Sequence, residues 1–118
     1  MFKWGIIGVG LVSRAFTVGV NGCASSASVV SVYSRNKESS DHFARDFGIE
    51  FVTDSVEELC ASGIDAVYIA TPPKYHEVYA LACINSGLPI LVEKPFAYDS
   101  CAALRIINAA NEKGVFCM

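Results

Sequence analysis

Residues 2–13 read FKWGIIGVGLVS, an apolar run that leads directly into two glycines. The run 2–7 predicts a β-strand, and residues 11–20 are compatible with a helix. A strand, a tight glycine turn and a helix start form the arrangement that binds the pyrophosphate of a dinucleotide. Gly8 lets the backbone turn sharply, and Gly10 leaves room for the pyrophosphate oxygens because it has no Cβ. The free N–H groups of the first helical turn, at Leu11 and Val12, would hold the anion.

The third small residue of this motif is Ser13, where glycine or alanine is usual. Serine is a mild departure, because this position only has to let the helix pack closely on the strand. The same six residues could also form a glycine turn that simply joins a strand to a helix. The motif alone therefore leaves both interpretations open.

The end of the next predicted strand indicates which dinucleotide is bound. Residues 29–33 predict a buried strand, which is followed by Ser34 and Arg35. An NAD-binding domain usually places Asp or Glu at this strand end to bond the ribose 2′-hydroxyl. A guanidinium can instead bind a phosphate with two hydrogen bonds, and a serine hydroxyl can donate to the same oxygens. We therefore expect NADP(H) to be preferred and NAD(H) to be possible; the alternative is a solvated basic residue at a strand end.

The length of 118 residues fits one domain spanning residues 1–118. A hydrophobic share of 53% and a mean hydropathy of +0.39 are expected for a parallel sheet covered on both faces. The chain has no apolar run of membrane length and no signal peptide, so we expect it in the cytoplasm and away from membranes. The net charge of −3 and the scattered basic residues give no reason to expect nucleic acid.

Five cysteines occur, at positions 23, 60, 83, 101 and 117. Their number is odd and they show no C-x-x-C spacing, so the sequence predicts neither a disulfide framework nor a metal site. We interpret them as free thiols in a reducing compartment, most of them filling the core.

Strands and helices alternate along the whole chain with short joints. The predicted strands cover 2–7, 29–33, 49–52, 64–70, 88–92 and 115–118; the predicted helices cover 11–20, 37–47, a brief segment at 57–59 capped by Asp54 or Ser55, 75–86, and a last one capped by Asp99 that runs through Leu104, Ile107 and Ala110 to Gly114. This order predicts an α/β fold with a doubly wound parallel sheet, the Rossmann fold, in the strand order 3-2-1-4-5-6. The candidate residues fall at the carboxyl ends of the strands, where such sheets bind ligands.

Two further motifs follow the fourth and fifth predicted strands. They are Thr71-Pro72-Pro73 with His76, and Glu93-Lys94-Pro95. Together with the glycine turn and Ser34-Arg35, they make the whole chain resemble the glucose-fructose oxidoreductase and inositol dehydrogenase family, called Gfo/Idh/MocA. Residues 4–6 and 11–13, with Phe16 and Thr17, look most like the dimeric dihydrodiol dehydrogenases of that family, a subgroup that prefers NADP.

The resemblance implies a catalytic role for Lys94, beside the nicotinamide and the substrate hydroxyl, where it would orient both and assist proton transfer. Glu93 would lie near the nicotinamide end of the cofactor. The turn formed by Thr71, Pro72 and Pro73 would line the adenosine ribose and the pyrophosphate.

Two of these roles have alternatives. Lys94 could be an ordinary strand-end cation paired with Glu93. His76 is placed near the nicotinamide ribose by the resemblance, but it could equally be a histidine at a helix start that only bonds backbone.

Family members continue past the sixth strand into a second α/β domain that supplies most of the substrate pocket, and we interpret that domain as absent from this sequence. The resemblance implies hydride transfer to or from a sugar, a polyol or a related diol. We expect these 118 residues to bind cofactor without turnover. An apolar edge at a short sixth strand favours a homo-oligomer. The alternative function is a stand-alone dinucleotide-binding or regulatory module without catalysis.

Overall fold

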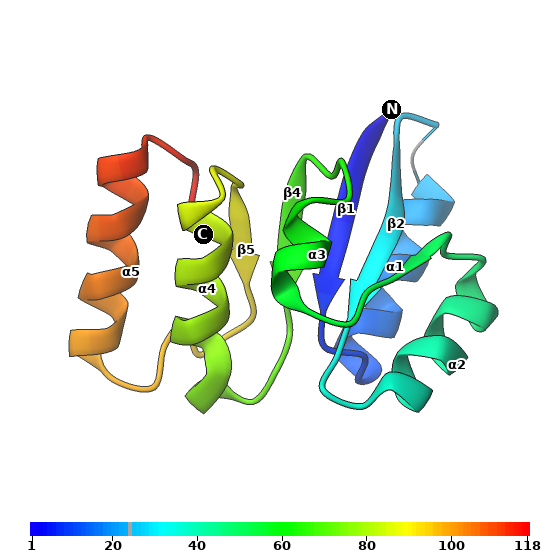
Figure 1. The fold of residues 1–118 in the computed structure, drawn as a ribbon, viewed down its shortest axis with the longest axis horizontal. Coiled ribbons are helices and arrows are strands. Elements are labelled where there is room, and N and C mark those ends of the chain that lie inside the picture. Colours follow the sequence, from blue (N-terminus) through cyan, green and yellow to red (C-terminus); the bar gives the residue numbers. More distant parts are fainter. Residues whose placement is uncertain (24) are drawn as a thin grey trace.

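A computed structural model describes residues 1–23 and 25–118. Five parallel strands form one sheet in the order β3-β2-β1-β4-β5 (Figure 1). The elements are β1 Phe2–Ile7, α1 Leu11–Cys23, β2 Ala27–Tyr33, α2 Lys37–Phe47, β3 Phe51–Val52, α3 Val56–Cys60, β4 Ala66–Ile69, the 3-10 turn η1 Pro73–Tyr75, α4 His76–Asn85, β5 Ile90–Val92 and α5 Ser100–Lys113. The Rossmann fold and the predicted order of the first five strands are confirmed.

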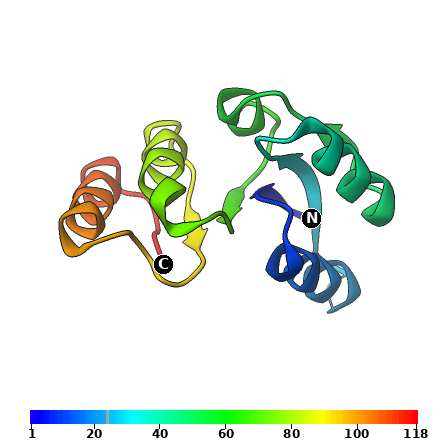
Figure 2. The ribbon, with the colours of Figure 1, turned by 90° about the horizontal axis from the view of Figure 1, so that it is seen from below.

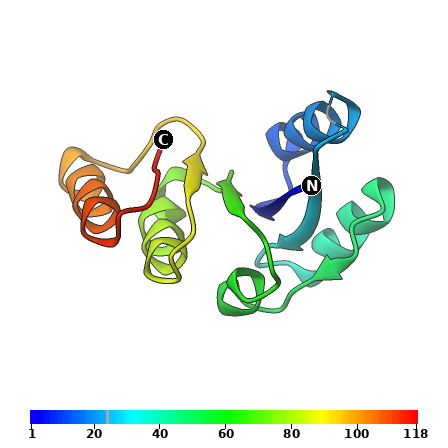
Figure 3. The same ribbon diagram turned by 90° about the horizontal axis from the view of Figure 1, so that it is seen from above.

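Helices cover the sheet from both sides. Successive strand residues point to opposite faces, so Ile6 packs in the cluster beneath α1 and α2, and Ile7 packs in the cluster beneath α3, α4 and α5. Figures 2 and 3 show α1 on one side of the sheet and α4 and α5 on the other. Burial on both faces explains why the central strands are continuous apolar runs. In the part of the chain that the structure describes, no helix is both long and apolar enough to cross a membrane.

The predicted strands 64–70 and 88–92 are longer than β4 and β5. Ile64 is buried, yet it lies before the paired residues of β4. An apolar run predicts which residues are buried, and some buried residues lie outside the paired part of a strand. The predicted strands are therefore too long. The predicted strand 115–118 makes a single parallel bridge, from Cys117 to Ile90, at the free edge of β5.

The last helix, α5, has the predicted caps and buries a row of residues spaced one turn apart. The Asp99 side chain accepts from the N–H of Ala102, and Gly114 adopts the left-handed conformation at the other end. The buried residues are Ala102, Ile106 and Ala110, spaced four apart, whereas Leu104 and Ile107 are 58% and 42% exposed. The N-cap of α3 is Ser55, which accepts from the N–H of Glu58.

The described cysteines differ in how deeply they are buried. All four cysteines whose side chains the structure describes are free thiols, but Cys83 alone among them is fully buried. Cys60 and Cys117 are half-buried, and Cys101 is exposed on α5. The side chain of Cys23 lies outside the described part. Cys83 belongs to a core cluster, and Cys60 and Cys117 pack against it, so three of the four described cysteines contribute to the core as predicted, and Cys101 does not.

Candidate cofactor site

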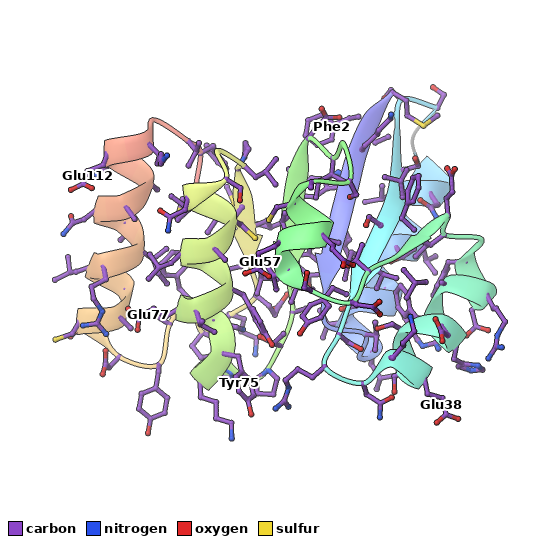
Figure 4. All side chains as sticks on the ribbon, in the orientation of Figure 1. Phe2, Glu38, Glu57, Tyr75, Glu77 and Glu112 are labelled. Carbon is purple, nitrogen blue, oxygen red and sulfur yellow. The ribbon has the colours of Figure 1, made fainter. Side chains whose placement is uncertain are left out.

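The carboxyl ends of four strands lie side by side. Ile7 of β1 pairs with Tyr33 of β2 and with Ile69 of β4, and Ile69 pairs in turn with Val92 of β5. The arrow of β1 points to the lower edge in Figure 1, and Figure 4 labels Tyr75 and Glu38 at that same edge. The predicted site residues follow these strand ends, so the fold brings them to one edge of the sheet.

The two glycines of the first turn have different reasons for lacking a side chain. Gly8 has φ +98°, and a Cβ there would lie 2.3 Å from the carbonyl oxygen of Ala70. A side chain is thus excluded by the protein itself. A Cβ on Gly10 would meet no atom within 4 Å. Gly10 therefore borders open space, which is what a position reserved for a ligand requires.

Ser13 completes the turn in a way that glycine could not. Its side chain is buried, and its hydroxyl donates to the carbonyl oxygen of Gly8 over 2.7 Å. The helix α1 begins beside it, with Leu11 85% exposed and Val12 50% exposed. The first turn of α1 carries no acidic side chain. An exposed helix start without negative charge suits the binding of an anion.

A surface hollow joins the ends of β1, β2 and β4. Ser34 and Arg35 come from the end of β2, and Thr71 and Pro72 come from the end of β4. The complete lining is Ile7, Val9, Ser34, Arg35, Asn36, Ser39, Thr71, Pro72 and Tyr79. Pro73 follows as the first residue of η1. The hollow thus unites the glycine turn with both predicted adenosine-side motifs.

Arg35 is held in place by an aromatic residue 40 positions away. Its guanidinium carbon lies 4.0 Å from the ring centre of Tyr75, and its Nη1 donates to the Tyr75 hydroxyl over 2.5 Å. Stacking of this kind fixes the plane of the guanidinium and leaves other N–H groups available to a ligand. Ser34 is also engaged, since its hydroxyl donates to the carbonyl oxygen of Asn36 over 2.8 Å and lies 2.6 Å from Ser40 Oγ.

His76 is fully buried at the start of α4. Its Nε2 lies 2.8 Å from the carbonyl oxygen of Thr71, and its Nδ1 lies 3.0 Å from that of Pro95. The ring therefore bridges the turn after β4 and the turn after β5. This placement matches the alternative in which the histidine bonds backbone, and a direct contact with the nicotinamide ribose stays a prediction.

Glu93 and Lys94 follow β5 and have contrasting environments. The Tyr68 hydroxyl donates to Glu93 Oε2 over 2.7 Å, and the Tyr68 ring stacks on Phe16 of α1 with centroids 4.1 Å apart. Burial is the main reason that the pKa of Tyr68 is raised, and the Glu93 carboxylate raises it further. The Tyr68 hydroxyl therefore stays protonated and donates. Lys94 is exposed, and in residues 1–23 and 25–118 it forms no ion pair with Glu93 or another acid. The described contacts therefore do not support the ordinary pairing of Lys94 with Glu93.

Several residues of the site are not evident from the sequence. Asn36 lines the hollow and caps α2 by accepting from the N–H of Ser39, and its position before a helical segment is a detectable signal. Tyr75 and Tyr68 carry no such signal, because their partners are distant in sequence. Glu38 lines an adjoining hollow with Arg14 and His42. The described residues contain no group of three or more His, Cys, Asp or Glu side chains arranged to bind a metal.

Comparison with known proteins agrees with this geometry. Residues 2–118 match the model of the oxidoreductase family with an NAD-binding Rossmann fold. The chain is 36% identical over 106 residues to inositol 2-dehydrogenase 4 of Saccharopolyspora erythraea, covering 89% of this chain and 31% of that protein. It is 32% identical over 118 residues to trans-1,2-dihydrobenzene-1,2-diol dehydrogenase of Mus musculus, covering 98% of this chain and 35% of that protein.

A solved structure is similar over the same region. Biliverdin reductase from Synechocystis, in complex with biliverdin and NADP⁺, superposes with a TM-score of 0.88 at 26% identity, covering 98% of this chain and 36% of that one. The chain thus spans about a third of the length of the proteins it matches. By its glycine turn, its sheet order and the match over residues 2–118, the chain belongs to the Gfo/Idh/MocA oxidoreductase family, within its NAD-binding Rossmann domain.

Proposed function

We propose that this chain is the nucleotide-binding domain of an oxidoreductase that prefers NADP(H) and transfers hydride to or from a sugar, a polyol or a related diol. The observation that carries the proposal is the hollow at the sheet edge, where Arg35 is presented beside Ser34 and no acid occupies either position. The open space at Gly10 and the exposed start of α1 suit the pyrophosphate. The residues present therefore fit a dinucleotide.

The preference for NADP(H) depends on charge at the end of β2. A 2′-phosphate on the adenosine ribose would be repelled by an acid there, and a guanidinium can form two hydrogen bonds with it. The contact of Arg35 with Tyr75 supports this role, because a stacked guanidinium loses less freedom on binding. Glu38 in the first turn of α2 is the nearby opposing charge.

Lys94 is proposed as the catalytic residue. When bound, the nicotinamide cofactor supplies or accepts the hydride. Lys94 is exposed after β5, and its ammonium group would bind the substrate hydroxyl, stabilise negative charge on that oxygen and move a proton there. A module that only senses a dinucleotide has no need of this lysine, so its presence favours an enzyme.

The substrate class and the assembly of the protein are also proposals. The named relatives act on inositol and on a dihydrobenzene diol, which supports a polyhydroxylated small molecule as substrate. A cytoplasmic location is supported by the four cysteines with described side chains, all of which are free thiols. Self-association is supported by an apolar hollow on the α1 side of the sheet, lined by Phe2, Trp4, Ala66, Pro89, Ile90, Leu91, Phe116 and Met118.

Titration calorimetry with NADPH and NADH tests the cofactor assignment. We expect tighter binding of NADPH, and we expect Arg35→Ala to weaken NADPH binding by roughly tenfold to a hundredfold, since a charge-assisted contact contributes about 1.5–3 kcal/mol. Binding of NADH should change little. Lys37→Ala is the matched control, because it also removes one positive charge, two residues after Arg35. The Lys37 ammonium group pairs with Asp54 over 2.9 Å. Equal affinity of the unaltered chain for both cofactors would contradict the preference.

A further inference from the structure

Two cysteines lie close together between α3 and α4. They are remote from the edge of the sheet at the carboxyl ends of the strands, which we call the cofactor edge. Cys60 is the last residue of α3 and Cys83 lies in α4, and their Sγ atoms are 3.9 Å apart. Cys83 is fully buried in the core and Cys60 is half-buried. An approach of about 2 Å would bring the two sulfur atoms to the length of a disulfide bond. The fold therefore places two thiols, 23 positions apart in sequence, within reach of each other.

The two thiols have opposite acidities. Once Cys60 is ionised, the Cys83 thiol donates to its sulfur, and this contact is the main reason that the pKa of Cys60 is lowered to about 7 despite partial burial; Ser86 lowers it further. The pKa of Cys83 is raised, because it is the donor to Cys60 and because it is buried. Glu57 is the charged neighbour of the pair and raises both pKa values, as the smallest contribution to each. Cys60 is thus the nucleophile and Cys83 the protonated partner.

Cys60 can be reached from solvent through a surface hollow. Residues of both helices form this hollow, among them Val56, Glu57 and Cys60 of α3 and Val78 and Ala82 of α4. Figure 4 shows Glu57 on the side of α3 that faces α4. A small oxidant can therefore meet Cys60 first, while Cys83 is reached through Cys60.

We propose that Cys60 and Cys83 form a reversible oxidation site, in which a hydroperoxide oxidises Cys60 and Cys83 converts the product into an intramolecular disulfide. In the first step the Cys60 thiolate attacks one peroxide oxygen and the O–O bond breaks. Cys60 becomes a sulfenic acid, oxidised by two electrons, and the departing oxygen takes up a proton to leave as water or an alcohol. In the second step the Cys83 sulfur attacks the Cys60 sulfur, the S–O bond breaks, and the released hydroxide takes the Cys83 proton and leaves as water.

The bond would connect the two halves of the sheet. One half of the sheet consists of β1, β2 and β3, and α3 follows β3. The other half consists of β4 and β5, and α4 follows β4. Cys60 lies shortly before β4 begins at Ala66, so the pair is near the amino ends of the strands and remote from the cofactor edge. We therefore expect oxidation to raise the resistance of the domain to unfolding and to leave NADPH affinity within twofold.

The test is oxidation of the chain with hydrogen peroxide, followed by alkylation of the remaining thiols and peptide mapping by mass spectrometry. We expect a linked pair of peptides containing Cys60 and Cys83, the loss of two alkylation sites, and full recovery of both after dithiothreitol. Cys101→Ser is the matched control and should form the same bond. Alkylation of both Cys60 and Cys83 after peroxide treatment, or a bond that uses another cysteine, would overturn the proposal.

Single substitutions separate the two roles. In Cys60→Ser no disulfide should form at Cys83, and in Cys83→Ser the Cys60 sulfenic acid should accumulate and react with dimedone. Cys83→Ala removes the donor to Cys60, so alkylation of Cys60 at pH 7 should become roughly threefold slower, whereas Cys83→Ser retains a hydroxyl donor and should slow it less. If substitution of the buried Cys83 prevents folding, Cys60→Ser and the wild-type peptide map still decide the outcome. Unchanged reactivity of Cys60 in a folded Cys83→Ala chain would show that Cys83 does not activate it.

Discussion

The cofactor edge has two parts, one at the ends of β1, β2 and β4 and one at the end of β5. They differ in how completely residues of this domain surround the site. At the ends of β1, β2 and β4, the turn, Arg35 and Pro72 surround one hollow, and their polar groups are already held by protein contacts. At the end of β5, Lys94 is exposed and has no ionic partner among the described residues. A binding site can be assembled within one sheet edge. A reaction site also has to enclose the substrate, and we infer that further protein surface supplies this enclosure at Lys94.

The largest expected effect separates reaction from binding at Lys94. In the complete enzyme, Lys94→Met should lower kcat by about a hundredfold or more, because a group that acts on the reacting proton is used mainly in the transition state. Cofactor affinity should stay within a few fold. Steady-state kinetics and a fluorescence titration with NADPH measure the two quantities. Lys113→Met, at the far end of α5, is the control for loss of a lysine charge, and an unchanged kcat in Lys94→Met would remove Lys94 from the mechanism.

The next comparison lies within the glycine turn. Gly8→Ala should destabilise the domain by about 2–4 kcal/mol, because φ +98° disfavours a side chain and the new Cβ would overlap the Ala70 carbonyl. Gly10→Val should leave stability nearly unchanged and abolish dinucleotide binding. Urea denaturation and calorimetry distinguish the two effects. Tight NADPH binding by Gly10→Val would show that the cofactor lies elsewhere.

His76 connects the turn after β4 with the turn after β5, and so links the two parts of the cofactor edge. His76→Leu should cost about 1–3 kcal/mol of stability, because the buried imidazole can no longer hydrogen-bond to the carbonyl oxygens of Thr71 or Pro95. Hydrogen exchange should become faster around Lys94 and Pro95, an effect that a purely local loss would not produce. His76→Gln should restore part of the stability. His42→Leu, an exposed histidine of α2, is the control and should cost little.

The smallest expected effect concerns the tyrosine beneath Arg35. Tyr75→Phe keeps the ring and removes the hydroxyl that accepts from Arg35. NADPH affinity should fall about twofold to threefold, equivalent to roughly 0.5 kcal/mol, and NADH affinity should not change. Tyr75→Leu removes the ring as well and should cost more. Equal losses for NADPH and NADH would indicate that Tyr75 does not act through the 2′-phosphate.

Local patterns predicted the elements because their causes are local. The alternation of apolar and turn residues predicted the order of strands and helices, and the caps of α5 at Asp99 and Gly114 are as predicted. The buried side of α5 was less predictable. Leu104 and Ile107 are more apolar than Ala102, yet they are exposed and Ala102 is buried, because packing of the helix on the rest of the fold decides which side faces the core.

By itself, the sequence determined the βα order, the glycine turn and the motifs that follow each strand, because each depends on the properties of neighbouring residues. Only the tertiary structure decided that Tyr75 stacks on Arg35, that His76 joins Thr71 to Pro95, that Tyr68 binds Glu93 and that Cys60 meets Cys83. These partners lie between 5 and 40 positions apart. Their contacts are set by strand register and helix packing, and no local preference of the chain encodes them.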